Sequence, residues 1–288
     1  MKFAIIGGNT RWSRILIKNF KKFGHILLFT SSNYLKKKNN YINFKNIPIN
    51  NINFIILASN PVKNLEAFKY FIKKKIPVFI EKPISDNYKN FLTIKKLSKK
   101  SSYFVHYQHI YSEPINYLMN QLKKEKLHSL NIDFGKNGPK KNINSSYEWL
   151  PHPLSIFFYL TNQNLNISPK YSEYLNEQKT NIHINGNIKN GIFLDIKSGN
   201  NFKRKKYFIE INRNKKIYKY NATCPNKITI LTINSNQKKV IKFRNFPLES
   251  SIRIFNNIIN KNKKKRLIIK QNKEITNKIM NYFNKFDL

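Results

Sequence analysis

Short apolar runs alternate with helix-like segments through the N-terminal part of this chain, and this alternation limits the possible folds most strongly. The runs resemble buried parallel strands and lie at residues 3–6, 25–29, 54–58, 77–80 and 103–105. Between the runs, apolar side chains recur at helical spacing, as in Ile15, Leu16, Phe20 and Phe23. The alternation predicts an α/β domain with a parallel sheet and helical crossovers over residues 1–120.

The periodicity changes after about residue 120. Segments with an apolar residue at every second position now follow one another, separated by turn pairs such as Asn190-Gly191 and Ser198-Gly199. These segments lie at residues 130–134, 182–184, 193–196, 208–211, 217–220 and 228–233. With an apolar helix at residues 153–160 and helical periodicity after residue 252, they predict a second domain at residues 121–288. We expect an α+β domain with an open antiparallel sheet, whose last helices can pack back toward the first domain.

The composition narrows the classes of partner. A net charge of +40 attracts polyanions, but the Lys excess accompanies an excess of Asn, Ile, Phe and Tyr, as A/T-rich codons produce. The basic residues are scattered and lie in no nucleic-acid motif, so we expect no specific nucleic-acid partner. No apolar run reaches the roughly 18 residues of a membrane helix, and the N-terminus lacks a signal-peptide pattern. The single cysteine, Cys224, cannot form an internal disulfide, so we expect a cytoplasmic protein without a membrane partner.

The turn between the first strand and the first helix reads Gly7-Gly8-Asn9-Thr10-Arg11-Trp12. A helix that begins there offers unpaired N–H groups and a positive dipole end, which suit a pyrophosphate. Only the first glycine of a G-x-G-x-x-G pattern remains, with Asn9 and Trp12 at the other two positions. Asn tolerates a positive φ, whereas Trp is hard to accommodate at a close helix–strand contact. The turn alone fits two interpretations about equally well: a Rossmann-type dinucleotide site, or a strand–turn–helix without a ligand.

The end of the second strand bears on the choice of cofactor. It reads Thr30-Ser31-Ser32-Asn33, with lysines at residues 36–38, and contains no acid to bind the ribose hydroxyls of NAD. The small hydroxyls of Ser31 and Ser32 and the nearby lysines suit a 2′-phosphate. We therefore expect NADP, with NAD possible, and the missing acid is the stronger half of the argument because lysines lie everywhere. No metal site is expected.

Two motifs downstream carry a resemblance to a known family. The turn Ala58-Ser59-Asn60-Pro61 is followed by one helix, one strand and then Glu81-Lys82-Pro83. In this placement they resemble the glucose-fructose oxidoreductase/inositol dehydrogenase (Gfo/Idh/MocA) family of NAD(P)-dependent oxidoreductases. The resemblance implies that this turn and Glu81 line the cofactor cleft and that Lys82 lies beside nicotinamide and substrate. A lysine whose pKa is lowered by burial can exchange a proton with the reacting oxygen.

A second match is Glu148-Trp149-Leu150-Pro151-His152, which precedes the apolar helix. It is similar to the acid–His pair of the family's substrate site, with Glu in place of the commoner Asp. The resemblance implies that His152 donates or accepts a proton and that Glu148 orients the substrate or the imidazole. His109 and Tyr111, after the last strand of the first domain, are candidates for substrate contact, and polar packing at a hinge explains them equally well.

Together these features predict an NAD(P)-dependent dehydrogenase or reductase. It would transfer a hydride between nicotinamide and a carbinol, carbonyl or imine carbon of a sugar-like small molecule. The alternative is a catalytically silent dinucleotide-binding sensor or partner protein of the same fold, which the degenerate glycine loop favours. By resemblance, the open sheet face is buried in a partner subunit, so we expect a homodimer or homotetramer formed through residues 181–233.

Overall fold

The computed structural model describes residues 1–32, 39–98, 103–123, 126–138, 145–173, 180–235, 237–260 and 265–288. The chain forms two compact units. Unit 1 comprises Met1–His106 and Ser251–Thr276, and unit 2 comprises Tyr107–Ser250 and Asn277–Leu288. The sequence analysis placed residues 251–276 with the second domain, whereas they are part of unit 1.

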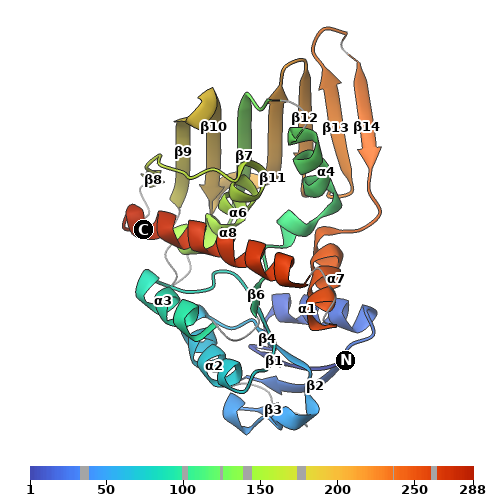
Figure 1. Ribbon diagram of the computed structural model, residues 1–288, viewed down its shortest axis with the longest axis vertical. Helices are drawn as coiled ribbons and strands as arrows, with labels where there is room; N and C mark the ends of the chain where they lie inside the picture. Colours follow the sequence, from blue (N-terminus) through green and yellow to red (C-terminus); the bar gives the residue numbers. More distant parts are fainter. Residues whose placement is uncertain are drawn as a thin grey trace. The chain divides into compact units, whose positions relative to one another are not determined.

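In the described part of unit 1, six parallel strands form a sheet in the order β3-β2-β1-β4-β5-β6 (Figure 1). The strands are β1 (Lys2–Ile6), β2 (Ile26–Ser31), β3 (Asn40–Tyr41), β4 (Phe54–Leu57), β5 (Val78–Ile80) and β6 (Tyr103–Val105). Every residue of β4, β5 and β6 is buried, as expected for parallel strands covered on both faces. This order is that of the dinucleotide-binding doubly wound sheet, and it confirms the predicted Rossmann-type domain.

Helices from both ends of the chain complete unit 1. They are α1 (Arg11–Lys22), α2 (Pro61–Lys73), α3 (Tyr88–Leu97), the short helices η1 (Phe44–Asn46) and η2 (Ile49–Asn51), and parts of α7 (Pro247–Ile259) and α8 (Lys265–Lys285). The ring of Phe255 in α7 contacts those of Phe20, Phe54, Phe79 and Phe104. This shared aromatic core explains why the C-terminal segment belongs to unit 1.

Asn272 of α8 pairs with the backbone of Val105 at the edge of the sheet. The N–H of Val105 donates to Asn272 Oδ1 at 2.9 Å, and Asn272 Nδ2 donates to the Val105 carbonyl at 2.9 Å. A strand at a sheet edge leaves such groups unpaired, so this side chain replaces a further strand.

Unit 2 contains a mixed sheet of eight described strands, in the order β14-β13-β12-β11-β7-β10-β9-β8 (Figure 1). They are β7 (Ser129–Asn137), β8 (Lys170–Glu173), β9 (Thr180–Ile188), β10 (Ile192–Gly199), β11 (Asn201–Arg213), β12 (Lys216–Asn221), β13 (Lys227–Thr232) and β14 (Lys238–Lys242). The described neighbours are antiparallel, as predicted, except for the parallel pair β7 and β10. Parallel neighbours need a long connection, and the helices and strands between β7 and β10 provide it.

One face of this sheet is apolar and buried. It carries Leu130, Ile132 and Phe134 of β7, which alternate with less buried residues along the strand. The described helices of the unit are η4 (Gln108–Tyr111), α4 (Glu113–Leu122), α5 (Ser145–Trp149), α6 (Pro151–Thr161) and the end of α8. Eight of the eleven residues of α6 are buried, which confirms the apolar helix predicted at residues 153–160.

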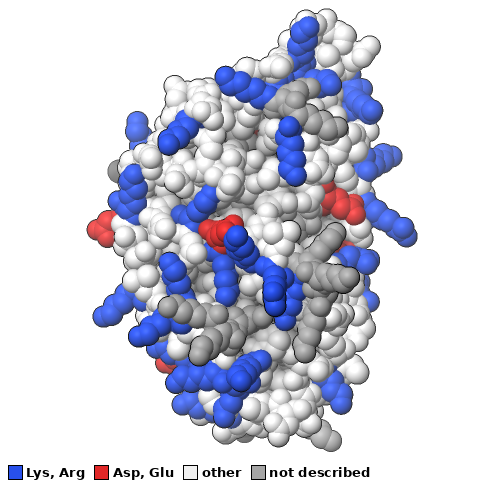
Figure 2. Space-filling view, viewed as in Figure 1, with Lys and Arg blue, Asp and Glu red and all other residues white. Residues whose placement is uncertain are grey.

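Positive charge is spread over the surface. Figure 2 shows Lys and Arg side chains over the whole visible face, with few acidic side chains between them. Among the described helices, none is both long and apolar enough to cross a membrane.

Candidate active site

Gly7 fixes the turn from β1 to α1. Its φ is +84°, and a Cβ atom at this position would lie 2.7 Å from both the carbonyl oxygen of Ala58 and the nitrogen of Ser59. Its own N–H donates to the carbonyl of Ser31 at 2.9 Å. Glycine is therefore required here for both conformation and space. The contacts bring together Gly7, Ser31, Ala58 and Ser59, four predicted cofactor residues, at the carboxyl ends of β1, β2 and β4.

The start of α1 differs from the expectation for Trp12. The Oγ of the buried Ser13 donates to the Gly7 carbonyl at 2.6 Å, and the Ser13 N–H donates to the capping Thr10 Oγ1 at 3.0 Å. The small residue at the close contact is thus Ser13. Trp12 instead is 36% exposed, and its ring stacks on that of His106 at 6.4 Å between centroids. Trp12 therefore does not occupy the close contact between helix and strand, which removes the difficulty that its size raised.

The left-handed position of the turn is Gly7. Among residues 7–12, all of them described, Gly7 alone has a positive φ, so Asn9 needs no special conformation. Gly8 has ordinary backbone angles, and a Cβ there would lie 3.3 Å from the Thr30 side chain. Gly8 therefore lies against β2, as Gly7 lies against β4.

The first turn of α1 is positively charged. It contains no acidic residue, and both Arg11 and Arg14 are exposed. Together with Ile15 and Lys18 they line a surface pocket of about 450 Å³. Because a helix N-terminus is itself positive, cations there are unfavourable unless an anion is bound beside them. The electrostatics of this helix start suit a phosphate group.

The end of β2 is tied to the edge strand β3. Ser31 and Ser32 are both buried. Asn40 Nδ2 donates to the Ser32 carbonyl at 3.1 Å, and Asn40 Oδ1 accepts from Thr30 Oγ1 at 2.7 Å. Asn33 and the lysines at residues 36–38 lie outside the described residues. What bears on the cofactor is therefore the lack of any acid from Ser31 to Asn33.

The turn after β4 is held by two asparagines. Asn60 caps α2 by accepting from the N–H of Lys63 at 2.8 Å, and Pro61 occupies the first helical position. The buried Asn64 accepts from the N–H of Ser59 at 3.1 Å and donates to its carbonyl at 3.0 Å. Asn64 therefore holds the Ser59 peptide of this turn in place.

Glu81 and Lys82 follow directly after β5. The backbone N–H of Glu81 donates to the Leu57 carbonyl at 2.9 Å, which places the motif beside the end of β4. The Glu81 carboxylate lies 2.6 Å from Nδ1 of His106, and both side chains are buried. Lys82 is half-buried, and its bond to Pro83 is cis. Lys82 thus leaves the sheet at the edge where Gly7 and Ser59 lie.

In unit 2, His109 and His152 lie together. Their ring centroids are 5.8 Å apart at an angle of 74°. They surround an aromatic pair that the sequence analysis missed, Phe134 of β7 and Tyr207 of β11, whose rings stack at 5.0 Å with a 5° angle. His109 contacts Phe134 at 5.0 Å, and His152 contacts the same ring at 6.0 Å. Alternation along the strands places Phe134 on the apolar face, but only the strand pairing brings Tyr207 opposite it.

Glu148 is buried in α5, near this cluster. Burial, together with the charge of Glu148, raises the pKa of the Tyr207 hydroxyl. Tyr111 is buried on the same short helix as His109. The carboxylate of Glu148, the two imidazoles and the phenol of Tyr207 can bond to hydroxyl groups and exchange protons with them. Lys82 belongs to unit 1 and His152 to unit 2, so their convergence on one substrate stays a prediction.

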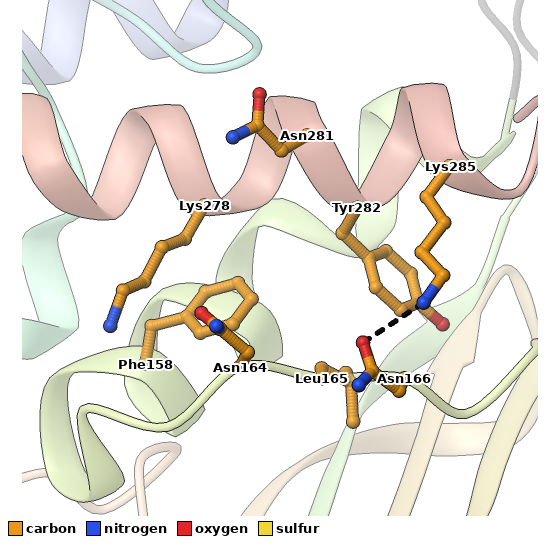
Figure 3. Close-up of a pocket in the computed structure, with 8 residues that line it drawn as sticks. All are labelled: Phe158, Asn164, Leu165, Asn166, Lys278, Asn281, Tyr282 and Lys285. Carbon is orange, nitrogen blue, oxygen red and sulfur yellow. Dashed lines mark hydrogen bonds between the residues drawn. The ribbon is translucent and has the colours of Figure 1, made fainter.

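In unit 2, a pocket of about 220 Å³ lies between α8 and the segment after α6 (Figure 3). Lys278 donates to the carbonyl and Oδ1 of Asn162 at 2.8 and 2.7 Å, and Lys285 donates to Asn166 Oδ1 at 3.0 Å. These bonds tie the helix to the segment, and none of the predicted site residues lines the pocket. We assign it a structural role. Among the described residues, no group of three or more His, Cys, Asp and Glu side chains is placed to hold a metal.

No protein-family model matches the sequence, and no curated protein matches it. Solved structures, however, resemble it over nearly the whole chain. A Gfo/Idh/MocA family oxidoreductase from Vibrio cholerae has a TM-score of 0.77 at 13% identity, covering 100% of this chain and 98% of that one. A UDP-N-acetylglucosamine 3-dehydrogenase from Acidithiobacillus ferrooxidans has a TM-score of 0.80 at 10% identity, with coverages of 98% and 96%.

An oxidoreductase from Agrobacterium radiobacter, solved in complex with NAD+, L-tartaric acid and magnesium, has a TM-score of 0.77 at 10% identity, with coverages of 100% and 96%. At identities this low, the structural similarity establishes a shared fold alone. The chain therefore has the fold of the Gfo/Idh/MocA family oxidoreductases, as its two motifs predict.

Proposed function

We propose that this protein is an NAD(P)-dependent oxidoreductase that transfers a hydride between nicotinamide and a carbinol, carbonyl or imine carbon of a sugar-like small molecule. The observation that carries the proposal is the Gly7 turn, seated against Ala58 and Ser59 at the sheet edge from which Lys82 emerges. Neighbours of the same fold that act on a nucleotide sugar or bind NAD+ support it.

The described residues at this edge fit a dinucleotide. The lack of a side chain at Gly7 lets the turn after β1 lie directly against Ala58 and Ser59, and the start of α1 combines backbone donors with Arg11. We assign the pyrophosphate to residues 7–12 and the rest of the cofactor to Ser31, Ser32, residues 58–61 and Glu81. The bound nicotinamide supplies the hydride acceptor or donor.

Lys82 and His152 are the proposed acid–base pair. One exchanges a proton at the substrate oxygen while the other polarises it, and Glu148 orients the imidazole or the substrate. His109 and Tyr111 are proposed substrate contacts, and we add the half-buried Tyr207 as a neighbour of His109.

Single and double substitutions test this pair. Lys82→Ala and His152→Ala should each lower turnover by about 10²- to 10⁴-fold, with the Kd of the cofactor nearly unchanged. Because both groups act at one atom, the double variant should lose less than the product of the two losses. Full activity in either single variant would overturn the assignment.

We propose NADP as the preferred cofactor because no acid follows β2. Protein fluorescence titrated with NADPH and NADH in a Trp149→Phe variant, in which Trp12 is the remaining tryptophan, measures the preference. Tighter binding of NADH would contradict it, and binding of neither cofactor would contradict the oxidoreductase itself. Cofactor binding without turnover on a panel of carbonyl and polyol compounds would favour the alternative, a catalytically silent protein of this fold.

We also propose a homodimer or homotetramer formed through the outer sheet face of unit 2. On this face Asp133, Asp195 and Glu210 pair with Lys206, His183 and Lys219, at N–O distances of 2.5, 2.5 and 3.3 Å. The pairs lower the local positive charge, so two copies of a strongly basic chain can approach there. A monomer by light scattering at micromolar concentration would contradict this.

We infer a cytoplasmic protein with a small-molecule substrate and no specific nucleic-acid or membrane partner. The reducing cytoplasm suits the exposed thiol of Cys224.

A further inference from the structure

Three buried side chains of unit 1, two directly after β5 and β6 and one in α7, are bonded in a row. Nδ1 of His106 lies 2.6 Å from the Glu81 carboxylate, and Nε2 of the same ring lies 2.8 Å from Ser251 Oγ. Glu81 is 8% exposed, His106 2% and Ser251 0%. A carboxylate only accepts hydrogen bonds, so the Nδ1–H of His106 donates to Glu81, and in the neutral ring Nε2 accepts from the Ser251 hydroxyl. The direction of the bond to Glu81 is thereby fixed.

This chain of bonds is costly for a purely structural element. Burying a carboxylate is unfavourable unless it is fully bonded, and apolar residues of similar volume commonly stabilise such a position as well or better. What a directed chain of bonds provides is orientation. Glu81 is joined to Lys82 by one peptide bond, so whatever fixes Glu81 also fixes the base of the Lys82 side chain.

The His106 ring is also packed between aromatic side chains. The Phe79 ring lies 4.7 Å from it, and the Trp12 ring stacks on it with an angle of 22°. Trp12 is the second residue of α1. One imidazole therefore contacts both the start of the helix that we assign to the pyrophosphate and the carboxylate beside Lys82.

We propose that His106 is a positioning residue that holds the Glu81-Lys82 turn in register with the start of α1, with Ser251 fixing the imidazole. This proposal rests on the proposed function for the role of Lys82. It predicts that breaking the His106–Glu81 bond displaces the Lys82 amine and lowers kcat, while the turn around Gly7 keeps its affinity for the cofactor.

Two substitutions at position 106 separate bonding from packing. His106→Phe keeps a ring against Trp12 and Phe79 but removes both bonds. His106→Asn keeps an amide that can donate to Glu81 but removes the ring. We expect kcat to fall by about 10²-fold in His106→Phe, the size of loss that a misplacement of about 1 Å produces, with a much smaller change in the Kd of the cofactor. His106→Asn should recover most of that loss.

A second measurement does not depend on turnover. Lysines dimethylated with ¹³C give separate NMR signals, and Lys82→Ala identifies the signal of Lys82. This signal should shift in His106→Phe and return toward its original position in His106→Asn. Should His106→Phe fail to fold, Ser251→Ala leaves the Glu81 bond in place and frees the ring, and a smaller shift is expected.

The outcomes distinguish the two proposals. A shifted Lys82 signal in a protein that turns over no substrate supports positioning and contradicts the proposed function. An unshifted signal in both His106→Phe and Ser251→Ala overturns positioning, whatever the activity. An equal loss of kcat in His106→Phe and His106→Asn also overturns it, because ring packing would then matter and the bond to Glu81 would not.

Discussion

Replacing Gly7 by Ala tests the geometry on which the cofactor site depends. The new Cβ would lie 2.7 Å from the Ala58 carbonyl oxygen and from the Ser59 nitrogen, closer than the 3.0 Å that real Cβ contacts respect. Both obstacles are backbone atoms, which cannot rotate away as a side chain can. Because Asn64 holds the Ser59 peptide with two hydrogen bonds, the turn after β4 can move only by breaking them.

The chain offers a matched control in Gly24→Ala. Gly24 has a similar φ, +76° against +84°, but a Cβ there would meet nothing within 4 Å. In both variants, alanine in the left-handed conformation destabilises the folded protein by about 1–2 kcal/mol. In both, restriction of the unfolded chain raises the free energy of unfolding by about 0.4–1 kcal/mol. The steric conflict applies to Gly7 alone and, as overpacking, costs about 1–3 kcal/mol more. The difference between the two variants isolates that last contribution.

Urea unfolding and cofactor titration measure the two consequences. Gly7→Ala should lower the free energy of unfolding of unit 1 by about 1–3 kcal/mol more than Gly24→Ala does. It should also weaken cofactor binding, because the two turns are pushed apart at the point where the pyrophosphate is proposed to bind. Gly24→Ala should bind the cofactor as the parent protein does.

Equal stability of the two variants would show that the turns after β1 and β4 do not touch. Equal cofactor binding, with the stability difference present, would show that the cofactor is not held at Gly7. The two results refute different steps of the reasoning.

Two further predictions concern unit 1. Asn272→Ala leaves the N–H and carbonyl of Val105 without their partner, and an unsatisfied buried polar group costs about 1–3 kcal/mol. Urea unfolding should therefore show a loss of stability at least twice that of the control Asn256→Ala, which removes one side-chain bond to His25. Equal losses would contradict the edge pairing. Burial lowers the pKa of His25 from 6.5, with the nearby N-terminal charge acting the same way and the Asn256 bond opposing them. Below about pH 6.5 the unfolded chain then binds a proton that the folded chain does not, so stability should fall as the pH drops, and less so in His25→Gln. A parent stability that rises toward pH 5 would contradict this.

The parallel sheet was predictable because buried parallel strands are continuous apolar runs. Strands β1, β4, β5 and β6 lie within a residue or two of the predicted segments. The sequence analysis missed β3, which has two residues, Asn40 and Tyr41, and no apolar run. Local pattern is uninformative for an edge strand that short, whose position depends on pairing with β2.

The placement of α7 and α8 could not be read from periodicity. The spacing of Ile252, Phe255 and Ile259 predicts one apolar face, and a helix forms there. It does not say which core that face meets. The ring of Phe255 meets those of Phe54 and Phe79, roughly 200 residues earlier in the chain. Contacts this distant in sequence are determined by the assembled sheet.

The bond between Glu81 and His106 was within reach of sequence reasoning. Each residue directly follows a strand, β5 or β6, and these strands are parallel neighbours. The carboxyl ends of parallel neighbours meet at one edge of the sheet, so a carboxylate and an imidazole there are expected to pair. The family resemblance directed attention to Lys82 and to a cofactor role for Glu81, and His106 was not considered as a partner of Glu81.

The degenerate glycine loop carries less weight against function than the sequence suggests. Each glycine of the G-x-G-x-x-G pattern has a physical task, and the structure shows how those tasks are met here. Gly7 keeps the one left-handed conformation in the turn, with no room for a side chain. Asn9 has no positive φ to satisfy. The close contact between helix and strand involves Ser13, whose hydroxyl bonds to the Gly7 carbonyl, while Trp12 points to His106. The missing glycines are therefore substitutions that this turn accommodates, and they do not favour a protein that has lost its cofactor.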